Sequence, residues 1–391
     1  MKVAIFGAGY VGCVTASSLA SLGHTVWLVE SSKSKLARLK AADCPIVEPG
    51  LEKVLPGHIR KGRVIPVAKP EEAVQRTELA LISVGTPSLP DGSADIRQVQ
   101  TVLFEIAGAL KSRRSPYVIA LRSTVPYPQI AGTLLPKLEA AIPGRLGKDV
   151  TFALNPEFLR EGSALHDFVH PPFIVVGTAH ASAARCLRQL YKNVKAPFHV
   201  ISLGSASLLK YACNAYHAAK IVFANEIAGL ASPFDADANE VMDIFCKDPI
   251  LNISAAYLRP GFAYGGSCLP KDLKTLCRLS AMEAIGTPFL DAVEKSNEAL
   301  IEKTVQAVSG YGVRKIGLIG LTFKAGTDDF RNSPLVELAE RLLGKGFELS
   351  IYDPDIDLKK VHGQNLRFIE QRLPHLAQEE DWVGITDSRL Q

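Results

Sequence analysis

The chain has 391 residues, a hydrophobic fraction of 47%, a charged fraction of 21% and a formal net charge of +4. This length favours two or three domains, and the composition is ordinary for a globular protein with buried cores. The small net charge and the absence of a basic run interleaved with aromatics argue against a nucleic-acid-binding protein. No apolar stretch approaches the ~18 residues of a membrane span, and the first residues lack the pattern of a signal peptide.

The cysteines indicate the compartment. Seven of them are scattered over positions 13, 44, 186, 213, 246, 268 and 277, without a C-x-x-C pair. An odd, scattered set is typical of a reducing cytosol rather than of a disulfide framework, and its spacing fits no zinc site. We therefore expect a soluble, cytoplasmic protein without a bound metal.

Residues 1–30 predict a unit that binds a dinucleotide. A strand is followed directly by Gly7, Gly9 and Gly12, which form G-x-G-x-x-G, and then by a helix and a second strand. In this motif the first glycine makes the tight turn, the second admits the pyrophosphate and the third packs helix on strand. Glu30 ends the second strand, where a carboxylate binds the ribose of NAD and repels the 2'-phosphate of NADP. With strand, helix and acid in register, NAD binding is favoured over a turn that serves packing alone.

Further apolar strands end near residues 84, 121, 154 and 177 and alternate with helical stretches. This alternation predicts an α/β fold with a parallel, doubly wound sheet of the Rossmann type. Ligands bind at the carboxyl ends of such strands. Because polar residues follow the strands repeatedly, we expect a shared cleft rather than ordinary loops; these residues are Thr86, Ser123, Thr124, Asn155, Glu157 and Glu161.

Residues 206–231 predict one long helix. At 3.6 residues per turn, Lys210, Asn214, His217 and Asn225 fall along one face. Most other positions are apolar, so we expect the helix to be enveloped nearly all round, and a buried ammonium then needs anionic or polar partners. A solvated face is the alternative, and a lone histidine is more often a satisfied core residue. The shared face favours a substrate-facing stripe, and the helix could also pair with its copy across a two-fold axis.

The stretch "GGSCLPKD" places Cys268 between glycines and the start of a helix. A structural cysteine prefers apolar neighbours, whereas Gly265 and Gly266 would let the backbone approach a ligand. The helix N-terminus and the ammonium of Lys271 both favour thiolate over thiol. The pattern suits a nucleophile; a structural cysteine in a glycine-rich turn is the alternative.

Residues 314–353 repeat the order strand, glycine-containing loop, helix and strand ending in an acid. The loop carries Lys324 and Arg331, which could hold phosphates or a base or be ordinary surface cations. Beyond residue 376 the chain is short and mostly polar, so we expect an incomplete Rossmann-like domain with an open sheet edge. We would then expect the protein to bind a GDP-sugar weakly or not at all, with NAD binding less affected and with low solubility.

Seven segments follow one another in the order "GAGYVG", "VGTPS", "RSTV", "NPEFLREG", "KYACNAYHAAKIVFANE", "RPGFAYGGSCLPKD" and "FKAGTDDFRNSP". Through them the sequence resembles the UDP-glucose/GDP-mannose dehydrogenase family along nearly its whole length. "SCLPKD", "RPGF", "KAGTDD" and His217 resemble its GDP-mannose branch. The resemblance implies a Rossmann domain for NAD over residues 1–200, a central helical dimerisation and active-site region over 201–300, and a shortened sugar-nucleotide-binding domain over 301–391.

The chemistry implied by the resemblance is an NAD-dependent, four-electron oxidation of the C6 hydroxyl of GDP-mannose, as used in alginate biosynthesis, by a homodimer or higher homo-oligomer. Cys268 would trap the aldehyde as a thiohemiacetal, and water would release the uronate from the later thioester. Lys210 and Asn214 would stabilise the oxyanion, and Asp272 would orient Lys210 and assist the hydrolytic water. The resemblance also implies that proton transfer or contacts with the sugar involve Thr124, Glu157 and Glu161.

The resemblance also implies two sets of ligand contacts. The NAD contacts would be Gly7, Gly9, Tyr10, Val11, Gly12, Glu30, Lys35, Thr86, Thr124, Lys271 and Arg331. The sugar-nucleotide contacts would be Glu161, Lys210, Asn214, His217, Asn225, Tyr257, Arg259, Phe262, Gly265 and Lys324, some of those between 256 and 265 reaching into the partner subunit.

Two residues depart from the family pattern: Ala256 stands where the GDP-mannose branch tends to have tyrosine, and Glu30 replaces the usual Asp. Three alternatives to a GDP-mannose dehydrogenase stay open. The first is the same chemistry on UDP-glucose or another UDP-sugar, and the second is a shortened NAD-binding remnant without turnover. The third is a hydroxyacid dehydrogenase, which would not need Cys268.

Overall fold

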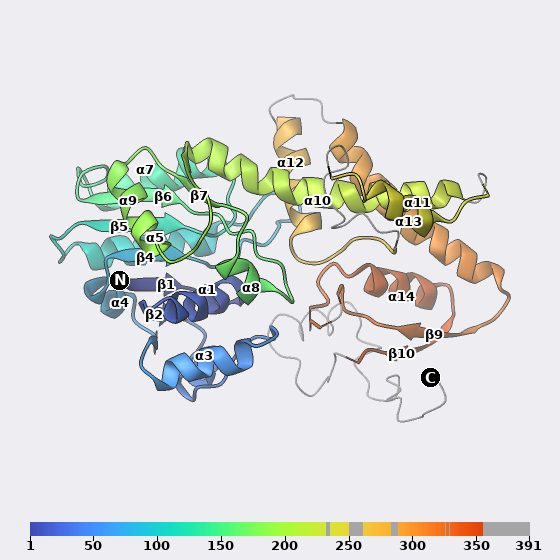
Figure 1. The fold of residues 1–391 in the computed structure, drawn as a ribbon, viewed down its shortest axis with the longest axis horizontal. Helices are drawn as coiled ribbons and strands as arrows, with labels where there is room; N and C mark the ends of the chain where they lie inside the picture. Colours follow the sequence, from blue (N-terminus) through green and yellow to red (C-terminus); the bar gives the residue numbers. More distant parts are fainter. Residues whose placement is uncertain (232–234, 250–260, 283–287, 325, 328, 355–391) are drawn as a thin grey trace. The chain divides into compact units, whose positions relative to one another are not determined.

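A computed structural model describes residues 1–231, 235–249, 261–282 and 288–354, except residues 325 and 328. The chain divides into two compact units, Met1–Lys210 and Tyr211–Gln391 (Figure 1). Within the described ranges, no helix combines the length and apolar character of a membrane span. The same ranges hold no group of three or more His, Cys, Asp or Glu side chains placed to bind a metal ion.

The first unit is built on one eight-stranded sheet with the order β3-β2-β1-β4-β5-β6-β7-β8. Its strands are β1 (Lys2–Phe6), β2 (Thr25–Val29), β3 (Val64–Val67), β4 (Leu79–Ile82), β5 (Tyr117–Leu121), β6 (Val150–Leu154), β7 (Ile174–Gly177) and β8 (Phe198–Ile201). The six strands from β3 to β6 are parallel, which confirms the doubly wound sheet predicted from the alternation of strands and helices.

One pairing differs from the prediction, because β7 is antiparallel to β6. A strand parallel to its predecessor needs a connection that returns to the end of the sheet where the preceding strand starts. Residues 155–173 contain one short helix, α8 (Ala164–Val169), and do not return to the opposite end of the sheet, so that β7 starts at the end where β6 stops. The sheet is parallel through β6 and reverses direction there.

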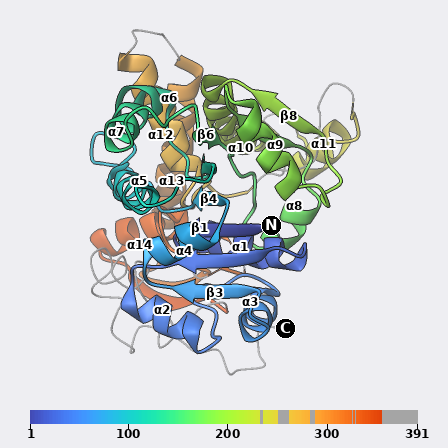
Figure 2. The ribbon, with the colours of Figure 1, turned by 90° about the vertical axis from the view of Figure 1, so that its left-hand side faces the viewer.

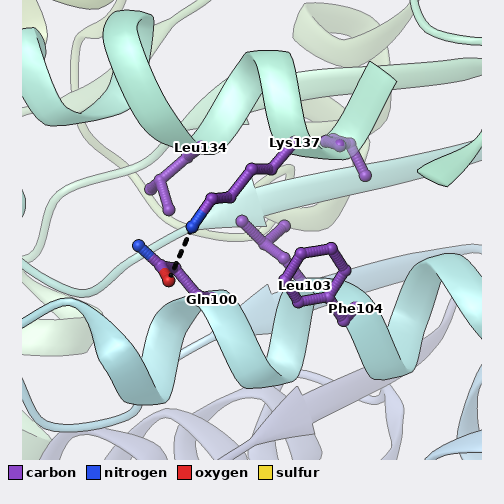
Figure 3. Close-up of a pocket in the computed structure, with 6 residues that line it drawn as sticks. Gln100, Leu103, Phe104, Leu134 and Lys137 are labelled. Carbon is purple, nitrogen blue, oxygen red and sulfur yellow. Dashed lines mark hydrogen bonds between the residues drawn. The ribbon is translucent and has the colours of Figure 1, made fainter. Parts of the chain in front are cut away.

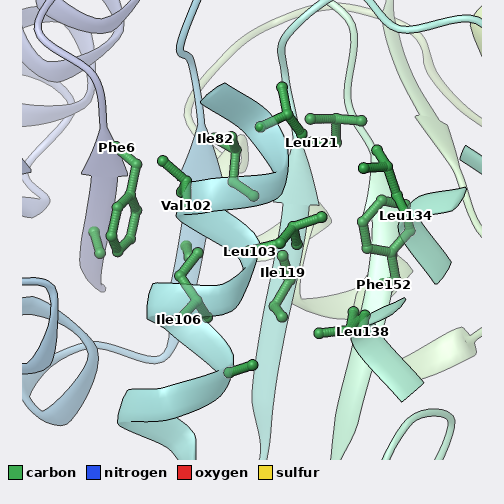
Figure 4. Close-up of a cluster of buried hydrophobic side chains, with 14 of the residues drawn as sticks. Phe6, Ile82, Val102, Leu103, Ile106, Ile119, Leu121, Leu134, Leu138 and Phe152 are labelled. Atoms are coloured by element: carbon green, nitrogen blue, oxygen red, sulfur yellow. The ribbon is translucent and has the colours of Figure 1, made fainter. Parts of the chain in front are cut away.

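Helices cover both faces of the sheet (Figure 2). They are α1 (Tyr10–Ser21), α2 (Lys33–Lys40), α3 (Leu51–Arg60), α4 (Pro70–Arg76), α5 (Arg97–Leu110), α6 (Tyr127–Gln129), the π-helical turn η1 (Ile130–Leu134), α7 (Leu135–Ala141), α8 and α9 (Ala181–Leu190). Side chains alternate along β1, so that Ala4 and Phe6 join one core while Val3 and Ile5 join the other. In the first of these cores Phe6 lies with Val102 of α5 and Leu138 of α7 (Figure 4).

The long helix α10 (Leu203–Ala231) begins in the first unit and continues in the second. The expectation that it is enveloped nearly all round is wrong, since Leu208, Tyr216 and Phe223 are exposed. At 100° per residue these three side chains lie opposite the face that carries Lys210 and Asn214. The helix therefore has a buried polar stripe and an exposed apolar face.

The second unit continues with α11 (Ala238–Phe245), α12 (Leu269–Met282), α13 (Pro288–Gly310), β9 (Lys315–Ile319), α14 (Pro334–Gly344) and β10 (Glu348–Tyr352). The strands β9 and β10 are parallel neighbours. Together with α14 they form a βαβ unit, as the repeated sequence pattern predicts. Residues 355–391, on which the expectation of an incomplete domain depends, lie outside the described residues.

Candidate functional site

The glycine turn after β1 has the shape that a dinucleotide pyrophosphate needs. Gly7 has a φ of +98°, and a Cβ atom added to Gly9 would meet nothing within 4 Å. A Cβ at Gly12 would lie 1.8 Å from the carbonyl oxygen of Gly7. A Cβ at Gly12 would also lie 3.8 Å from Cγ2 of Ile5 in β1, so Gly12 lets helix α1 pack closely on the end of the strand, as predicted.

The residues around this turn fit NAD. Helix α1 begins at Tyr10, and its N-cap Gly9 provides no side-chain hydrogen bond, so the first-turn amides can receive an anion. The buried carboxylate of Glu30 accepts the amide of Ala8 at 2.9 Å through Oε2 and the amide of Ser32 at 2.7 Å through Oε1. Lys35 follows, half-buried, in the first turn of α2.

Polar side chains gather at the carboxyl ends of β4, β5 and β6, as predicted. The Thr86 hydroxyl donates to the carbonyl of Thr124 at 3.0 Å. The Nη1 of Arg122 donates to Asn155 Oδ1 at 3.1 Å and to the Tyr191 hydroxyl at 3.0 Å. Hydrogen bonds therefore join the loops that follow neighbouring strands.

A buried ion pair lies beside this cluster. The ammonium of Lys210 is 3.1 Å from Oε1 of Glu157, and the two side chains are 6% and 10% exposed. Burial by itself would raise the pKa of Glu157, but the charges of Lys210 and Arg122 outweigh burial and hold this pKa below its usual value. The predicted need of Lys210 for an anionic partner is confirmed, and its partner in the first unit is Glu157.

A second polar cluster surrounds Asp272 in the second unit. The amide of Asn214 donates to Oδ2 of this buried carboxylate, and the ammonium of Lys271 lies 3.0 Å from Oδ1 without hydrogen-bond geometry. The hydroxyl of Tyr211 is buried and has no hydrogen-bond partner among the described residues. Burial and then the charge of Asp272 raise the pKa of Tyr211, which keeps the hydroxyl protonated.

Cys268 stands at the N-terminus of α12. Its carbonyl accepts the amide of Asp272 at 2.9 Å, which makes Cys268 the N-cap residue, and its Sγ lies 3.6 Å from the hydroxyl of Ser267. All seven cysteines belong to the described part of the chain, and Cys268 alone is exposed. The thiol therefore combines access to solvent with the positive end of a helix dipole.

The glycines before Cys268 lie close to another segment of the chain. A Cβ at Gly265 would lie 2.3 Å from the carbonyl oxygen of Asn332, and one at Gly266 would lie 2.8 Å from the ring of Phe323. These glycines let the loop approach the chain's own segment 323–334. Protein atoms therefore exclude a side chain at either position, and the approach of a ligand to these glycines stays a prediction.

Comparison with known proteins decides the family. Models of the UDP-glucose/GDP-mannose dehydrogenase family match this chain in three parts: the NAD binding domain over residues 1–195, the central domain over 204–299 and the UDP binding domain over 317–386. The chain belongs to the UDP-glucose/GDP-mannose dehydrogenase family. It is therefore an NAD-dependent dehydrogenase of sugar nucleotides, with the glycine turn in its NAD-binding domain.

Individual relatives extend over most of the chain. The GDP-mannose 6-dehydrogenase of Pseudomonas savastanoi pv. phaseolicola is 41% identical over 377 residues, which cover 96% of this chain and 86% of that protein. The UDP-glucose dehydrogenase of Pyrobaculum islandicum has 36% identity and a TM-score of 0.87, covering 93% of this chain and 84% of its own. A ternary complex of GDP-mannose dehydrogenase from Pseudomonas aeruginosa has 40% identity and a TM-score of 0.64, covering 98% and 87%.

Several contacts implied by the family resemblance have partners within the protein. The amide group of Asn225 donates to the carbonyl of Phe262 at 3.2 Å and accepts the amide of Gly261 at 2.7 Å, so that it holds the loop before Cys268. The ring of Phe262 packs against the core of the C-terminal βαβ unit. His217 is half-buried. Tyr257 and Arg259 lie outside the described residues, as does Ala256.

In the UDP-binding domain, the loop after β9 is held by its own charges. Arg331 forms a forked ion pair with Asp329, whose Oδ1 lies 2.8 Å from Nε, and the side chain of Lys324 is exposed. Asp353 at the end of β10 accepts the amide of Leu321 at 2.6 Å. This contact repeats the one that Glu30 makes with the glycine turn of the NAD-binding domain.

A hollow in the NAD-binding domain borders the candidate site. It measures about 40 Å³ and is lined by Arg122, Asn155, Glu157, Tyr191 and the rings of nearby phenylalanines. A smaller hollow between α5 and α7, where Lys137 donates to Gln100, contains none of the predicted site residues (Figure 3).

Sequence analysis missed Arg122 and Tyr211. Each is the immediate neighbour of a predicted residue, and that adjacency was the one signal the sequence offered.

Proposed function

We propose that this protein oxidises the C6 hydroxyl of GDP-mannose to a carboxylate, with two NAD molecules consumed per sugar nucleotide. The observation that carries the proposal is the exposed thiol of Cys268 at the N-cap of α12, with Lys271 and Asp272 in the first turn behind it. A dehydrogenase that stops at an aldehyde has no need of a nucleophile in this position. The 41% identical GDP-mannose 6-dehydrogenase supports the choice of sugar.

NAD, when bound, accepts the hydride in each of the two oxidations. Between them, Sγ of Cys268 adds to the aldehyde carbon while the carbonyl oxygen takes up a proton, which gives a thiohemiacetal. Oxidation of this adduct gives a thioester on Cys268. Water then attacks the thioester carbon, the carbon–sulfur bond breaks, and the uronate and the thiolate are released.

The charged residues have complementary roles in this scheme. The ammonium of Lys210 is a preorganised donor for an oxyanion, and Glu157 is held ionised beside it to take up a proton. Asp272, which accepts from the amide of Asn214, can orient the hydrolytic water. Thr124 belongs to the hydrogen-bonded cluster at the strand ends and completes the proton-handling set.

The same proposal assigns the remaining contacts and the assembly. The sugar nucleotide would contact Glu161, His217, Asn225, Tyr257, Arg259, Phe262, Gly265 and Lys324. NAD would contact the glycine turn and Tyr10, Val11, Glu30, Lys35, Thr86, Thr124, Lys271 and Arg331. The exposed apolar face of α10 supports a homodimer. We also propose the domain limits at residues 200 and 300.

UDP-glucose is a second candidate substrate. The structural similarity to the UDP-glucose dehydrogenase of Pyrobaculum islandicum, with a TM-score of 0.87, favours it, as does the match of residues 317–386 to a UDP-binding domain. The chemistry at Cys268 is the same for both sugars, so the two candidates differ only in the groups that bind sugar and base.

One experiment separates these candidates. Limiting GDP-mannose or limiting UDP-glucose is incubated with excess NAD, and NADH is counted by absorbance per sugar nucleotide consumed. Two NADH per GDP-mannose, with a uronate as product, are expected. One NADH per sugar with a released aldehyde would exclude the thioester. Turnover of UDP-glucose but not of GDP-mannose would make UDP-glucose the substrate. No turnover of either sugar nucleotide would exclude the enzymatic proposal.

A further inference from the structure

A carboxylate outside the predicted site joins two of its loops. Glu48 precedes α3 and is only 3% exposed. Its Oε2 accepts the hydroxyl of Tyr10 and the amide of Gly162, the latter at 2.7 Å, and its Oε1 accepts the amide of Ala164 at 2.7 Å. Both oxygens are therefore used, and all three donors come from segments distant in sequence from Glu48.

These donors belong to the two halves of the proposed site. Tyr10 is the first residue of α1 and directly follows the glycine turn that fits NAD. Gly162 directly follows Glu161, which is proposed to contact the sugar. The Glu161 carboxylate is also near Tyr10, because its charge is among the effects, after burial and the bond to Glu48, that raise the pKa of Tyr10.

The packing around Glu48 supports the same connection. Leu51, one helical turn further along the chain, is fully buried in the core that also receives Tyr10, Leu159 and Leu165. Leu159 and Leu165 flank the loop that carries Glu161. The loop is thus anchored in the core at both ends, and Glu48 holds the backbone between the anchors.

We propose that Glu48 is a positioning residue that ties the sugar-facing loop 159–164 to the NAD-binding turn, so that NAD bound at the turn orders this loop. The inference rests on the proposed function, since it assigns NAD to the turn and the sugar nucleotide to Glu161. Its mechanism is geometric. A shift of the glycine turn moves the Tyr10 hydroxyl, which is hydrogen-bonded to Glu48. A shift of the Glu48 carboxylate in turn moves the amides of Gly162 and Ala164, which donate to it.

Replacement by glutamine is a sharp test, because Gln has one acceptor oxygen where Glu has two. In Glu48→Gln the side-chain NH2 must face a donor, and at least one of the three hydrogen bonds is lost. Tyr10→Phe is the second variant: it leaves the bonds to Gly162 and Ala164 intact and removes only the connection to the turn. Glu52→Gln, exposed in the first turn of α3, is the matched control.

The readout is hydrogen exchange of backbone amides in the full chain, with and without saturating NAD. Exchange at Gly162 and Ala164 should slow on NAD binding in the parent and in Glu52→Gln. In Glu48→Gln it should be at least ~10-fold faster and lose the NAD response. In Tyr10→Phe it should remain slow without NAD and lose only the NAD response. The amide of Asn155, which lies outside loop 159–164 and donates to the carbonyl of Leu121 at 2.8 Å, is an internal control that should not change.

The outcomes are distinguishable. If Tyr10→Phe retains NAD-dependent protection of Gly162 and Ala164, Tyr10 and Glu48 do not couple the NAD-binding turn to the loop. If Glu48→Gln accelerates exchange equally at Asn155 and in the strands, Glu48 has only a structural role. As a kinetic readout, Glu48→Gln should raise KM for the sugar nucleotide roughly tenfold with a smaller change in kcat. Failure of the proposed function would leave the parent without turnover, whereas the exchange measurement needs only NAD.

Discussion

The ammonium nitrogen of Lys210 lies 3.1 Å from Oε1 of Glu157, and both side chains are buried. The two residues come from different elements, Lys210 from α10 and Glu157 from the loop after β6. The charges of Lys210 and Arg122 keep the buried Glu157 carboxylate ionised. The pair therefore links the start of the long helix to the carboxyl ends of the strands.

Removing one partner of this pair should destabilise the protein strongly. Lys210→Met leaves the Glu157 carboxylate buried without its main counter-charge, and a loss of about 3–5 kcal/mol in the free energy of unfolding is expected. Urea denaturation measures this loss. The exposed pair of Lys274 and Glu294 provides the control, since Lys274→Met should change stability by less than about 1 kcal/mol. A similar small effect of both variants would contradict a buried, mutually dependent pair.

The same pair predicts a dependence of stability on pH. Because the pKa of Glu157 is lower in the folded protein than its ordinary value of 4.5, the unfolded chain binds more protons below that pH. Its contribution is fully present above pH 4.5 and is lost as the pH falls through the folded-state pKa. The stability difference between the parent and Glu157→Gln, measured by urea denaturation, should therefore be constant from about pH 7 down to pH 4.5 and shrink below it. A stability difference that grows in acid would mean that the pKa of Glu157 is raised, not lowered, on folding.

Cys268→Ala should abolish uronate formation while NAD binding persists. The thiol is at the N-cap of α12 and the NAD turn is in the other unit, so removal of Sγ leaves the turn unchanged. Product analysis and calorimetric titration with NAD measure the two effects. Cys277→Ala is a control in the same helix, where burial raises the pKa of the thiol to about 12, and this variant should still form uronate. Uronate formation by Cys268→Ala at the parent rate would show that the thiol is structural.

Gly12→Ala should weaken NAD binding by roughly tenfold or more. The added methyl group would overlap the carbonyl oxygen of Gly7, 1.8 Å away, so the turn must change its shape. Titration with NAD tests this directly. Gly57→Ala within α3, where a Cβ meets nothing within 4 Å, should leave NAD affinity unchanged and raise stability by about 0.5–1 kcal/mol. Parent-like affinity of Gly12→Ala would mean that the turn tolerates a side chain.

Features that depend on a few neighbouring residues could be predicted from the sequence. The turn from Gly7 to Gly12, the acid Glu30 and the helix that starts behind Cys268 each arise within one βαβ unit or one helical turn. The polar stripe of α10 follows from helical periodicity alone, and the family resemblance follows from segments read in order. For these features, backbone geometry and side-chain spacing are already present in the sequence.

Features that depend on which elements pack together could not be predicted in this way. The direction of β7, the choice of Glu157 as the partner of Lys210, and the contact of Gly265 with Asn332 all join segments far apart in the chain. Glu48 is the clearest example, because 114 residues separate it from Gly162 and no spacing rule relates them. The sequence by itself determined the NAD turn and the position of the thiol, since local hydrogen bonds and periodicity specify them. Only the tertiary structure decided which buried charges and amides meet, since packing of distant elements sets those contacts.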